Sequence, residues 1–425
     1  MNLMLHGGEI YGQEKILYDF SVNINPLGVP ESVLHGLAGM CGSSDGHPDR
    51  DEQQLRQMLE RYPDQSCGRL RQALSGYTGL PAEKILCGNG ASELIEAVVR
   101  TIRPSRILLT APSFSGYRRA AENCGAGILY HVLRREDDFA LTDRFLEDLE
   151  NFGRTENRDS ATCTPARSFL DEENGTMAGQ QPGQERSVWP NPKTLRKEGS
   201  DAAGQQPGQD MVVLCSPSNP VGNLIDPPLL DRIAQICARK GIWLMVDECF
   251  LGFVADENQR TMRRYLAGGS IAGSRLLVVD AFTKRFAMPG TRLGYLMAAD
   301  TELLRRIHAQ QPEWSVSGPA QAAGCAALED SDAYLKKARK LVASERSRIA
   351  AALREMGFTV FPGEANYIFF SADSVDLTDA LLEKGILIRD CSNYPGLGKG
   401  YYRAAVKLPE ENDVLLDALR DILRG

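Results

Sequence analysis

Two basic side chains in the stretch 280–295 are spaced for chemistry on an anionic compound. Lys284 follows the apolar run 275–279, which predicts a buried strand, and Arg292 comes eight residues later, beyond a Pro–Gly turn. A lysine at a strand end beside a fixed arginine suits a reaction that needs an amine nucleophile next to an anionic group. A lone lysine in a loop is more often a solvated side chain, so this hypothesis depends on finding the rest of a site.

A glycine-rich turn provides a candidate phosphate site. The sequence GNGASE at 88–93 separates the predicted short strand 84–88 from an amphipathic helix. Gly90 permits a tight turn, and Ala91 and Ser92 then present backbone N–H groups at the N-terminus of that helix. Such N–H groups, together with the helix dipole, bind phosphate. Glycine turns before helices are common, so this motif indicates a phosphate site only if the other parts of a site are also present.

Three other side chains follow predicted strands. Asp247 ends the strand 241–248, and carboxylates at such positions of an open α/β sheet face the ligand crevice. It either caps a helix or holds a protonated ring nitrogen by a charge-assisted hydrogen bond. Asn219, in SPSNPVG, either starts a turn or presents its amide to a ligand oxygen. Phe114 either packs in the core or covers one face of a flat cofactor.

Two arginines near the C-terminus lie in or beside apolar, strand-like runs. Arg389 is in ILIRDC and Arg403 is in YYRAAVK. An arginine buried in such a run needs an anion, because an unpaired buried charge costs several kcal/mol. The pair therefore predicts a substrate with a carboxylate or phosphate that is held bidentately.

The elements that must position these residues alternate in type. Strands and helices alternate from about residue 84 to 152 and again from 211 to 298, which predicts a mostly parallel sheet covered on both faces. Long helices follow, and the chain closes with a mixture of short strands and helices. We therefore expect an α/β fold with a large sheet domain and a smaller α+β domain.

The domain limits follow from the same pattern. We expect an N-terminal arm at 1–40 that contributes to the small domain and the active site, a large domain at 41–300, and connecting helices with the small domain at 301–425. Residues 153–210 are poor in apolar side chains and contain AGQQPGQ twice. That composition predicts a disordered surface insertion, whose removal should leave activity largely intact.

Composition excludes several classes of protein. The 425 residues carry a net charge of −8 and are 43% hydrophobic, which favours a large core and argues against a nucleic-acid-binding or anionic-membrane surface. The ten cysteines show no CxxC pair, and the five histidines show no metal-ligand spacing. No signal peptide and no apolar run of membrane-spanning length is evident. We expect a cytoplasmic protein that holds no metal and binds neither nucleic acid nor membrane.

In their order along the chain, these motifs resemble the fold-type I pyridoxal-phosphate enzymes of the aspartate aminotransferase superfamily. The resemblance implies that the cofactor is pyridoxal 5′-phosphate, bound covalently by Lys284, with Asp247 at the pyridine nitrogen, Asn219 at the ring hydroxyl and Phe114 stacked on the ring. It assigns the cofactor phosphate to Gly90, Ala91, Ser92, Thr283 and Arg292. It also implies a homodimer with shared active sites, in which Tyr62 reaches the phosphate of the other subunit.

Within that superfamily, HGG at 6–8, DFSVNINPLG at 19–28 and RDCSNYPGL at 389–397 look like the L-threonine-O-3-phosphate decarboxylases of cobalamin biosynthesis. This resemblance implies decarboxylation of a small phosphorylated amino acid, L-threonine O-3-phosphate, to (R)-1-amino-2-propanol O-2-phosphate. The residues that it implies as substrate contacts are His6, Gly7, Asn23, Asn219, Arg389 and Arg403.

Two alternatives remain open: a histidinol-phosphate or related aminotransferase, and a non-catalytic homologue that binds pyridoxal phosphate. Two positions depart from the common pattern of the superfamily. Ala281 replaces a serine that many relatives use for the phosphate. Phe250 replaces a tyrosine that aminotransferases usually place near the ring hydroxyl, and this favours the decarboxylases, which often have phenylalanine.

Overall fold

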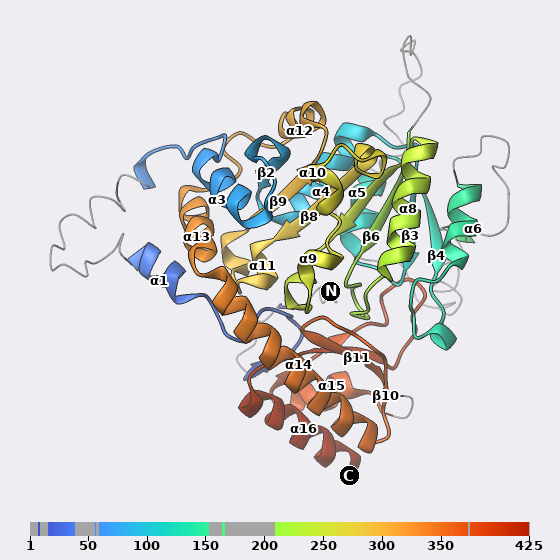
Figure 1. Cartoon of the computed structure of the whole chain (residues 1–425). Coiled ribbons are helices and arrows are strands. Elements are labelled where there is room, and N and C mark those ends of the chain that lie inside the picture. Colours follow the sequence, from blue (N-terminus) through green and yellow to red (C-terminus); the bar gives the residue numbers. More distant parts are fainter. Residues whose placement is uncertain are drawn as a thin grey trace, which may run out of the picture.

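The chain folds into a large α/β domain and a smaller α+β domain, as the sequence predicts (Figure 1). The structure is a computed structural model that describes residues 7–8, 16–38, 56, 59–152, 164–165, 209–372 and 375–424. His6 and nearly all of the expected insertion at 153–210 lie outside the described residues.

The large domain is built on an eight-stranded sheet in the order β2-β9-β8-β7-β6-β3-β4-β5. Five neighbouring strands, β8, β7, β6, β3 and β4, are parallel, whereas β2, β9 and β5 pair antiparallel. The prediction of a mostly parallel sheet is therefore confirmed. The strands are β2 Ile85–Gly88, β3 Arg106–Ala111, β4 Gly127–Val132, β5 Thr164–Pro165, β6 Asp210–Cys215, β7 Trp243–Asp247, β8 Leu276–Ala281 and β9 Gly294–Ala298.

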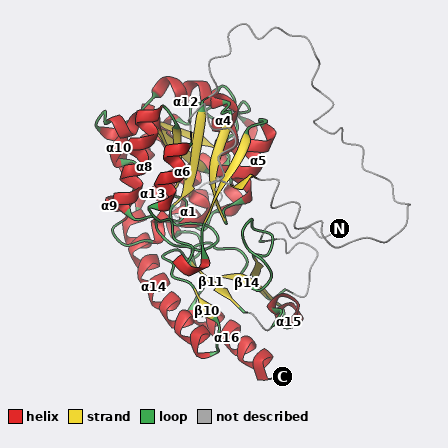
Figure 2. Ribbon diagram, turned by 90° about the vertical axis from the view of Figure 1, so that its right-hand side faces the viewer, coloured by secondary structure: helices red, strands yellow, loops and turns green. Residues whose placement is uncertain are grey.

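Helices cover both faces of this sheet, as Figure 2 shows from the side. Because strand side chains alternate between faces, Met211 and Val213 of β6 join one apolar core, and Val212 and Leu214 join the other. The first core is closed by α4 Gly90–Ile102, α5 Ser115–Asn123 and α12 Thr301–His308. The second is closed by α1 Glu31–Ala38, α3 Gly68–Thr78, α6 Arg144–Asn151, α8 Pro227–Lys240 and α13 Gly318–Glu329.

Short helices follow two of the central strands. After β7 come α9 Glu257–Arg260 and α10 Arg264–Ala267, and directly after β8 comes α11 Phe282–Arg285. The helix α11 is a single turn, so its side chains stay at the carboxyl edge of the sheet. This is the edge where ligands bind in open α/β sheets.

The small domain contains a four-stranded antiparallel sheet in the order β10-β11-β14-β13. Its elements are β10 Thr359–Val360, β11 Tyr367–Ser371, α15 Leu377–Glu383, β13 Arg389–Asp390, β14 Tyr401–Ala405 and α16 Pro409–Arg424. The long helix α14, Ser331–Glu355, runs from the large domain to the small one (Figure 1). The N-terminal arm joins the small domain, because β1 Tyr18–Asp19 pairs with β12 Ile386–Leu387.

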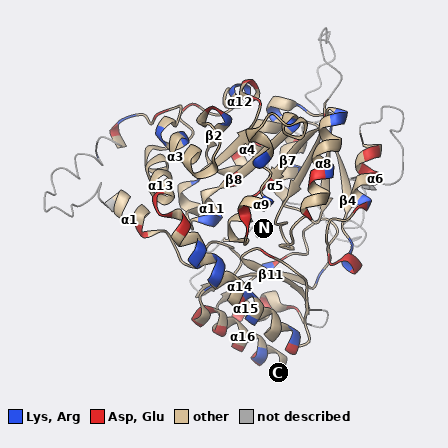
Figure 3. Ribbon diagram, viewed as in Figure 1, with Lys and Arg blue, Asp and Glu red and all other residues tan. Residues whose placement is uncertain are grey.

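Charged residues of both signs are interspersed along the outer helices (Figure 3). None of the helices that the structure describes is long and apolar enough to cross a membrane. The described cysteines are all free thiols, and the described residues contain no cluster of three or more potential metal ligands.

Candidate active site

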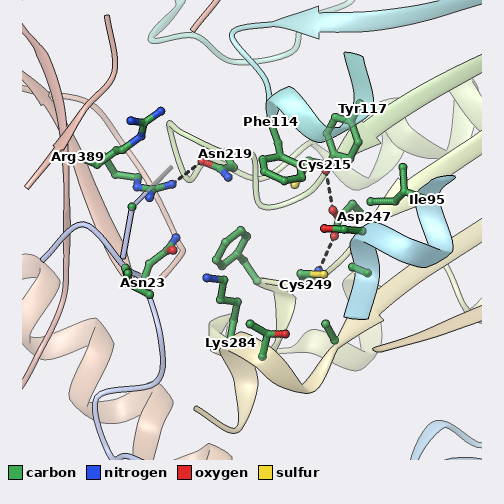
Figure 4. A pocket seen from close by; sticks show the side chains of 18 of the residues that line it. Asn23, Ile95, Phe114, Tyr117, Cys215, Asn219, Asp247, Cys249, Lys284 and Arg389 are labelled. Atoms are coloured by element: carbon green, nitrogen blue, oxygen red, sulfur yellow. Dashed lines mark hydrogen bonds between the residues drawn. The ribbon is translucent and has the colours of Figure 1, made fainter. Parts of the chain in front are cut away.

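A cavity of about 450 Å³ lies where the arm, the sheet edge and the small domain meet. It gathers most of the residues that the sequence singled out (Figure 4). The predicted residues that line it are Gly7, Asn23, Ala91, Ser92, Phe114, Asn219, Asp247, Thr283, Lys284, Arg292, Arg389 and Arg403. The other lining residues are Ser21, Val22, Ile95, Tyr117, Arg119, Cys215, Cys249, Phe250, Ala281 and Tyr394.

One side of the cavity, here called the carboxylate end, consists of Asp247, Tyr117 and Cys249. Asp247 ends β7 and is 6% exposed. Its Oδ2 accepts a hydrogen bond from Tyr117 Oη at 2.6 Å, and its Oδ1 accepts one from the Cys249 backbone N–H at 3.0 Å. Burial and the neighbouring Asp247 raise the pKa of Tyr117 well above its usual value, so the phenol stays protonated and remains a donor. The carboxylate is thereby held rigidly towards a ligand.

Lys284 projects from α11 between the two ends of the cavity (Figure 4). Removal of its amine from water, followed by repulsion from Arg403, lowers the pKa of Lys284 to about 8. A useful fraction of the amine is therefore neutral near neutral pH, as a nucleophile requires.

The helix turn that carries Lys284 is held from both sides. The arm holds it through Asn25, whose backbone N–H donates to the Lys284 carbonyl at 3.0 Å and whose Nδ2 donates to the Arg285 carbonyl at 2.9 Å. Beneath it, the buried Arg285 donates to Asp280 Oδ2 at 2.5 Å and to Glu257 Oε1 at 2.7 Å. Buried charges persist only when they are paired in this way. The sequence analysis singled out neither Asn25 nor Arg285.

The glycine turn forms a cradle at the N-terminus of α4. Gly90 adopts φ +80°, which strains any other residue, and a Cβ there would lie 2.9 Å from Arg292 Nη2. Ala91 and Ser92 line the cavity beside Thr283. Backbone N–H groups, a helix dipole and an arginine converge here, and this combination fits a phosphate group. Ala281 lies in the same wall and, having no hydroxyl, contributes no donor there from its side chain.

The opposite side of the cavity, here called the arginine end, consists of Arg389, Arg403, Asn219 and Asn23. The two arginines face each other across β13 and β14 and are 7% and 5% exposed. Like charges directly opposite each other on paired strands repel. Arg403 Nε and Asn23 Nδ2 are buried without a hydrogen-bond partner among the described residues. The arginine end therefore provides unsatisfied donors and positive charge for an anion.

Asn219 is oriented by the groups around its carbonyl oxygen. Its Oδ1 accepts hydrogen bonds from Arg403 Nη1 at 2.6 Å and from Tyr394 Oη at 3.3 Å. Arg403 Nη2 donates in turn to the Ser21 carbonyl at 3.0 Å, which ties the arm to the same network. With two donors on its oxygen, Asn219 presents Nδ2 as a donor to a ligand oxygen.

The arm can approach the cavity closely because residue 7 is glycine. A Cβ at Gly7 would lie 2.4 Å from the Ser21 carbonyl oxygen. The adjoining Gly8 N–H donates to Ser21 Oγ at 2.9 Å. The HGG motif therefore has a steric reason in this fold, although His6 itself lies outside the described residues.

Tyr62 is a predicted site residue that the structure does not bring to the cavity of its own chain. It is 77% exposed and stacks on Trp314, with ring centroids 4.3 Å apart. Conversely, the sequence analysis missed Tyr117, Tyr394 and Arg119 among the lining residues. Tyr394 lies inside the run 389–397 that carries the decarboxylase resemblance, so this run could have indicated that Tyr394 is a site residue.

An amine of lowered pKa, a fixed carboxylate, a phosphate cradle and the ring of Phe114 line one cavity. Together they fit a flat, phosphorylated aldehyde that contains a basic ring nitrogen. Sequence comparison matches residues 15–156 and 191–419 to the family described as aminotransferase class I and II. The chain belongs to this family of pyridoxal-phosphate-dependent enzymes, and its cofactor is pyridoxal 5′-phosphate. The unmatched residues 157–190 fall within the expected insertion.

Individual relatives have two different activities. The chain is 33% identical to the threonine-phosphate decarboxylase of Salmonella typhimurium, over 99% of this chain and 97% of the relative. It is 31% identical to a histidinol-phosphate aminotransferase of Desulfitobacterium hafniense, over 95% and 91% of the two chains. The crystal structure of the histidinol-phosphate aminotransferase from Clostridium acetobutylicum superposes with a TM-score of 0.72 and 25% identity, covering 96% of this chain and 99% of that one. The predicted aspartate aminotransferase-like fold is confirmed.

Proposed function

We propose that the protein decarboxylates L-threonine O-3-phosphate to (R)-1-amino-2-propanol O-2-phosphate, a step of cobalamin biosynthesis. The observation that carries the proposal is the arginine end, where Arg389 and Arg403 are buried opposite each other. Arg292 serves the cofactor phosphate and Arg119 pairs with Glu96 at 3.4 Å, so Arg389 and Arg403 remain for the substrate. Phosphothreonine carries a carboxylate and a phosphate in one small molecule and therefore uses both. The name of the Salmonella relative supports the same substrate.

The residues of the chain have distinct tasks in this reaction. Arg403 and Arg389 each bind one anionic group of the substrate, and Asn23 Nδ2 supplies a further donor. By holding both anionic groups of the substrate, the arginine end would orient the substrate so that the carboxylate is the group that leaves Cα. When bound, the cofactor accepts the electron pair that the departing CO₂ leaves.

Proton transfer falls to Lys284. Its amine lies within the cavity, and its pKa of about 8 leaves it largely protonated at neutral pH. An acid of that pKa is suited to donate a proton to Cα after CO₂ has left. Asp247 is the one carboxylate among the described lining residues, and Tyr117 holds it where it would meet the ring nitrogen of the cofactor.

The test is incubation of the holoenzyme with L-threonine O-3-phosphate in the absence of a keto acid. We expect one CO₂ for each aminopropanol phosphate formed. Amino transfer from phosphothreonine to 2-oxoglutarate without CO₂ would contradict the proposal.

A histidinol-phosphate aminotransferase is the second candidate, favoured by the 31% identity to the Desulfitobacterium enzyme. Histidinol phosphate itself has one anionic group and engages one arginine of the pair, whereas its cosubstrate 2-oxoglutarate, with two carboxylates, would engage both. The enzyme assayed with histidinol phosphate and 2-oxoglutarate distinguishes the two candidates, because the decarboxylase should form no glutamate.

A non-catalytic homologue that binds pyridoxal phosphate is the third candidate. The lowered pKa of Lys284 and the fixed Asp247 favour catalysis over mere binding. The absorption spectrum decides: the wild-type protein should show the band of a lysine-bound cofactor, and Lys284→Ala should lose it. A protein without this band, or a variant that keeps it, supports the non-catalytic alternative.

We further propose a homodimer in which Tyr62 completes the phosphate site of the partner subunit. The support is that Tyr62 and Leu59 are 77% and 65% exposed, while Tyr62 lies outside the cavity of its own chain. Light scattering tests the dimer. Hybrids of Lys284→Ala and Tyr62→Phe chains should regain one intact site and therefore activity; if Tyr62 acts only in its own chain, they should not.

The domain limits, the insertion and the cytoplasmic location belong to the same proposal. The role proposed for the arm at 1–40 is supported by Gly7 and Asn23, which line the cavity. A chain that lacks 153–210 should keep most of its decarboxylase activity. Loss of activity with cofactor binding retained would mean that the insertion reaches the site.

The proposed cytoplasmic location is tested by cell fractionation.

A further inference from the structure

Tyr394 contacts both a substrate-binding arginine and the asparagine assigned to the cofactor. The Arg389 guanidinium carbon lies 5.3 Å from the centroid of the Tyr394 ring, within the range of a cation–π contact. Tyr394 Oη donates to Asn219 Oδ1 at 3.3 Å. A single side chain of the small domain therefore connects the anion site with the ring-hydroxyl site.

The loop that carries Tyr394 is well ordered by its own hydrogen bonds. Tyr394 N–H donates to the Cys391 carbonyl at 3.1 Å, and Leu397 N–H donates to the Tyr394 carbonyl at 3.0 Å. Arg389 Nη2 donates to Asn393 Oδ1 at 2.8 Å. The loop thus holds Arg389 from its edge through Asn393 and from its face through Tyr394, which fixes the plane of the guanidinium.

Among the described lining residues, Tyr394 is the phenol that contacts Asn219, whose Oδ1 also accepts a hydrogen bond from Arg403 Nη1 at 2.6 Å. Phe250, which lies at the position from which a tyrosine often reaches the ring hydroxyl, packs its ring against Tyr367 at 5.2 Å. Tyr367 Oη donates to the Ser218 carbonyl, and Tyr117 Oη donates to Asp247. Tyr394 is therefore the lining phenol that faces Asn219.

We propose that Tyr394 is a positioning residue with two separable parts. Its ring sets the plane of Arg389 for the phosphorylated substrate, and its hydroxyl, with Arg403, turns the Asn219 amide so that Nδ2 donates to the cofactor ring oxygen. The part that concerns Arg389 rests on the proposed function, because it assumes that a substrate anion binds there. The part that concerns Asn219 rests only on the cofactor.

Two substitutions separate these parts. Tyr394→Phe removes the hydroxyl and keeps the ring, whereas Tyr394→Leu removes both. A donor to the ring oxygen competes with the proton of the lysine–cofactor linkage, so a misplaced Asn219 should raise the pH midpoint of that linkage. Since one hydrogen bond contributes about 1 kcal/mol and one pKa unit corresponds to 1.36 kcal/mol, we expect both variants to raise the midpoint by about 0.7.

Anion binding supplies the second measurement. For Tyr394→Leu we expect the KM for phosphothreonine, and the dissociation constant of inorganic phosphate measured by cofactor absorbance, to rise about tenfold, the upper range for loss of a partly buried cation–π contact. For Tyr394→Phe both constants should stay within about twofold, because the ring remains. Tyr401→Phe is the matched control, since its hydroxyl contacts Arg135 outside the cavity lining, and it should change neither measurement.

An unchanged pH midpoint in Tyr394→Phe would overturn the part that concerns Asn219. Equal losses of phosphate affinity in the two variants, or no loss in either, would overturn the part that concerns Arg389. If wild-type enzyme releases no CO₂ from phosphothreonine, the proposed function fails instead. The pH titration and the phosphate titration still decide about Tyr394, because neither depends on turnover.

Discussion

The carboxylate end and the arginine end of the cavity differ in how many of their polar and charged groups have partners within the protein. At the carboxylate end, Asp247 accepts hydrogen bonds from Tyr117 and Cys249 and belongs to a central strand of a rigid sheet. At the arginine end, Arg389 and Arg403 repel each other, and two buried donors lack partners in the described part of the chain. The hydrogen bonds at the first end are made within the protein, whereas under the proposed function the substrate supplies the missing partners at the second end.

Under the proposed function, the carboxylate end serves the chemistry of the reaction and the arginine end determines which substrate binds. The groups at the carboxylate end come from the large domain alone, but those at the arginine end come from the arm, the large domain and the small domain. A family can therefore keep one end and change the other. The relatives fit this view, because decarboxylases and aminotransferases have similar identities to this chain.

The largest effect should come from Asp247→Asn, which leaves the shape of the carboxylate end but removes its charge. Loss of a charge that acts directly at the reacting group typically costs about 10²- to 10³-fold in rate, and we expect a loss of that size in kcat with little change in KM. Steady-state kinetics with phosphothreonine check this. A change confined to KM would mean that the two ends do not divide the work in this way.

Arg403→Gln and Arg389→Gln should have the opposite pattern. Each removes one partner of a buried, charge-assisted contact, whose loss costs about 2–5 kcal/mol, so KM should rise by about 30-fold or more. The absorption spectrum without substrate should keep the band of the bound cofactor in both variants. If either variant fails to load cofactor, then the arginine end also contributes to cofactor binding.

Gly90→Ala tests the phosphate cradle at the N-terminus of α4, which belongs to neither end of the cavity. A Cβ there meets Arg292 at 2.9 Å, and φ +80° strains alanine by about 1–3 kcal/mol. We expect cofactor affinity to fall about tenfold, measured by equilibrium titration of the apoenzyme, while the KM of the reloaded enzyme is unchanged. Gly76→Ala is a suitable control, because a Cβ at Gly76 meets nothing within 4 Å.

The smallest effect is a shift in pH dependence. Because the pKa of Lys284 is lowered to about 8, the neutral amine accumulates as the pH rises through 8, and the rate of cofactor loading by apoenzyme should rise with it. Repulsion from Arg403 is part of the cause, so in Arg403→Gln the midpoint should move to higher pH. Stopped-flow absorbance measures both midpoints, and equal midpoints would show that the charge of Arg403 does not influence Lys284.

The residues that stand at strand ends were the easiest to predict. Lys284, Asp247 and Asn219 each follow an apolar run, and the alternation of strands and helices predicts that such ends meet at one edge of a sheet. The order of the strands was beyond reach, because pairing between β2 and β9 joins segments about 200 residues apart.

The residues that position those side chains were harder to predict. Tyr117, Asn25 and Arg285 act through contacts with distant segments, as when Tyr117 meets Asp247 across 130 residues of sequence. No local pattern marks such a partner, since a tyrosine near a helix start or an asparagine in a turn has many other uses. Tyr62 was predicted from resemblance alone, and the role proposed for it requires a second copy of the chain.

The register of β13 and β14 fixes the relative position of the two arginines that are proposed to bind the substrate. Arg389 lies opposite Arg403 in the ladder, so under the proposed function this pairing constrains the separation of the two anions that fit. Insertion of one residue into β13 would turn Arg389 to the other face of the sheet. Insertion of two would restore the face but move the charge along the strand by about 7 Å, which would suit a longer anionic molecule.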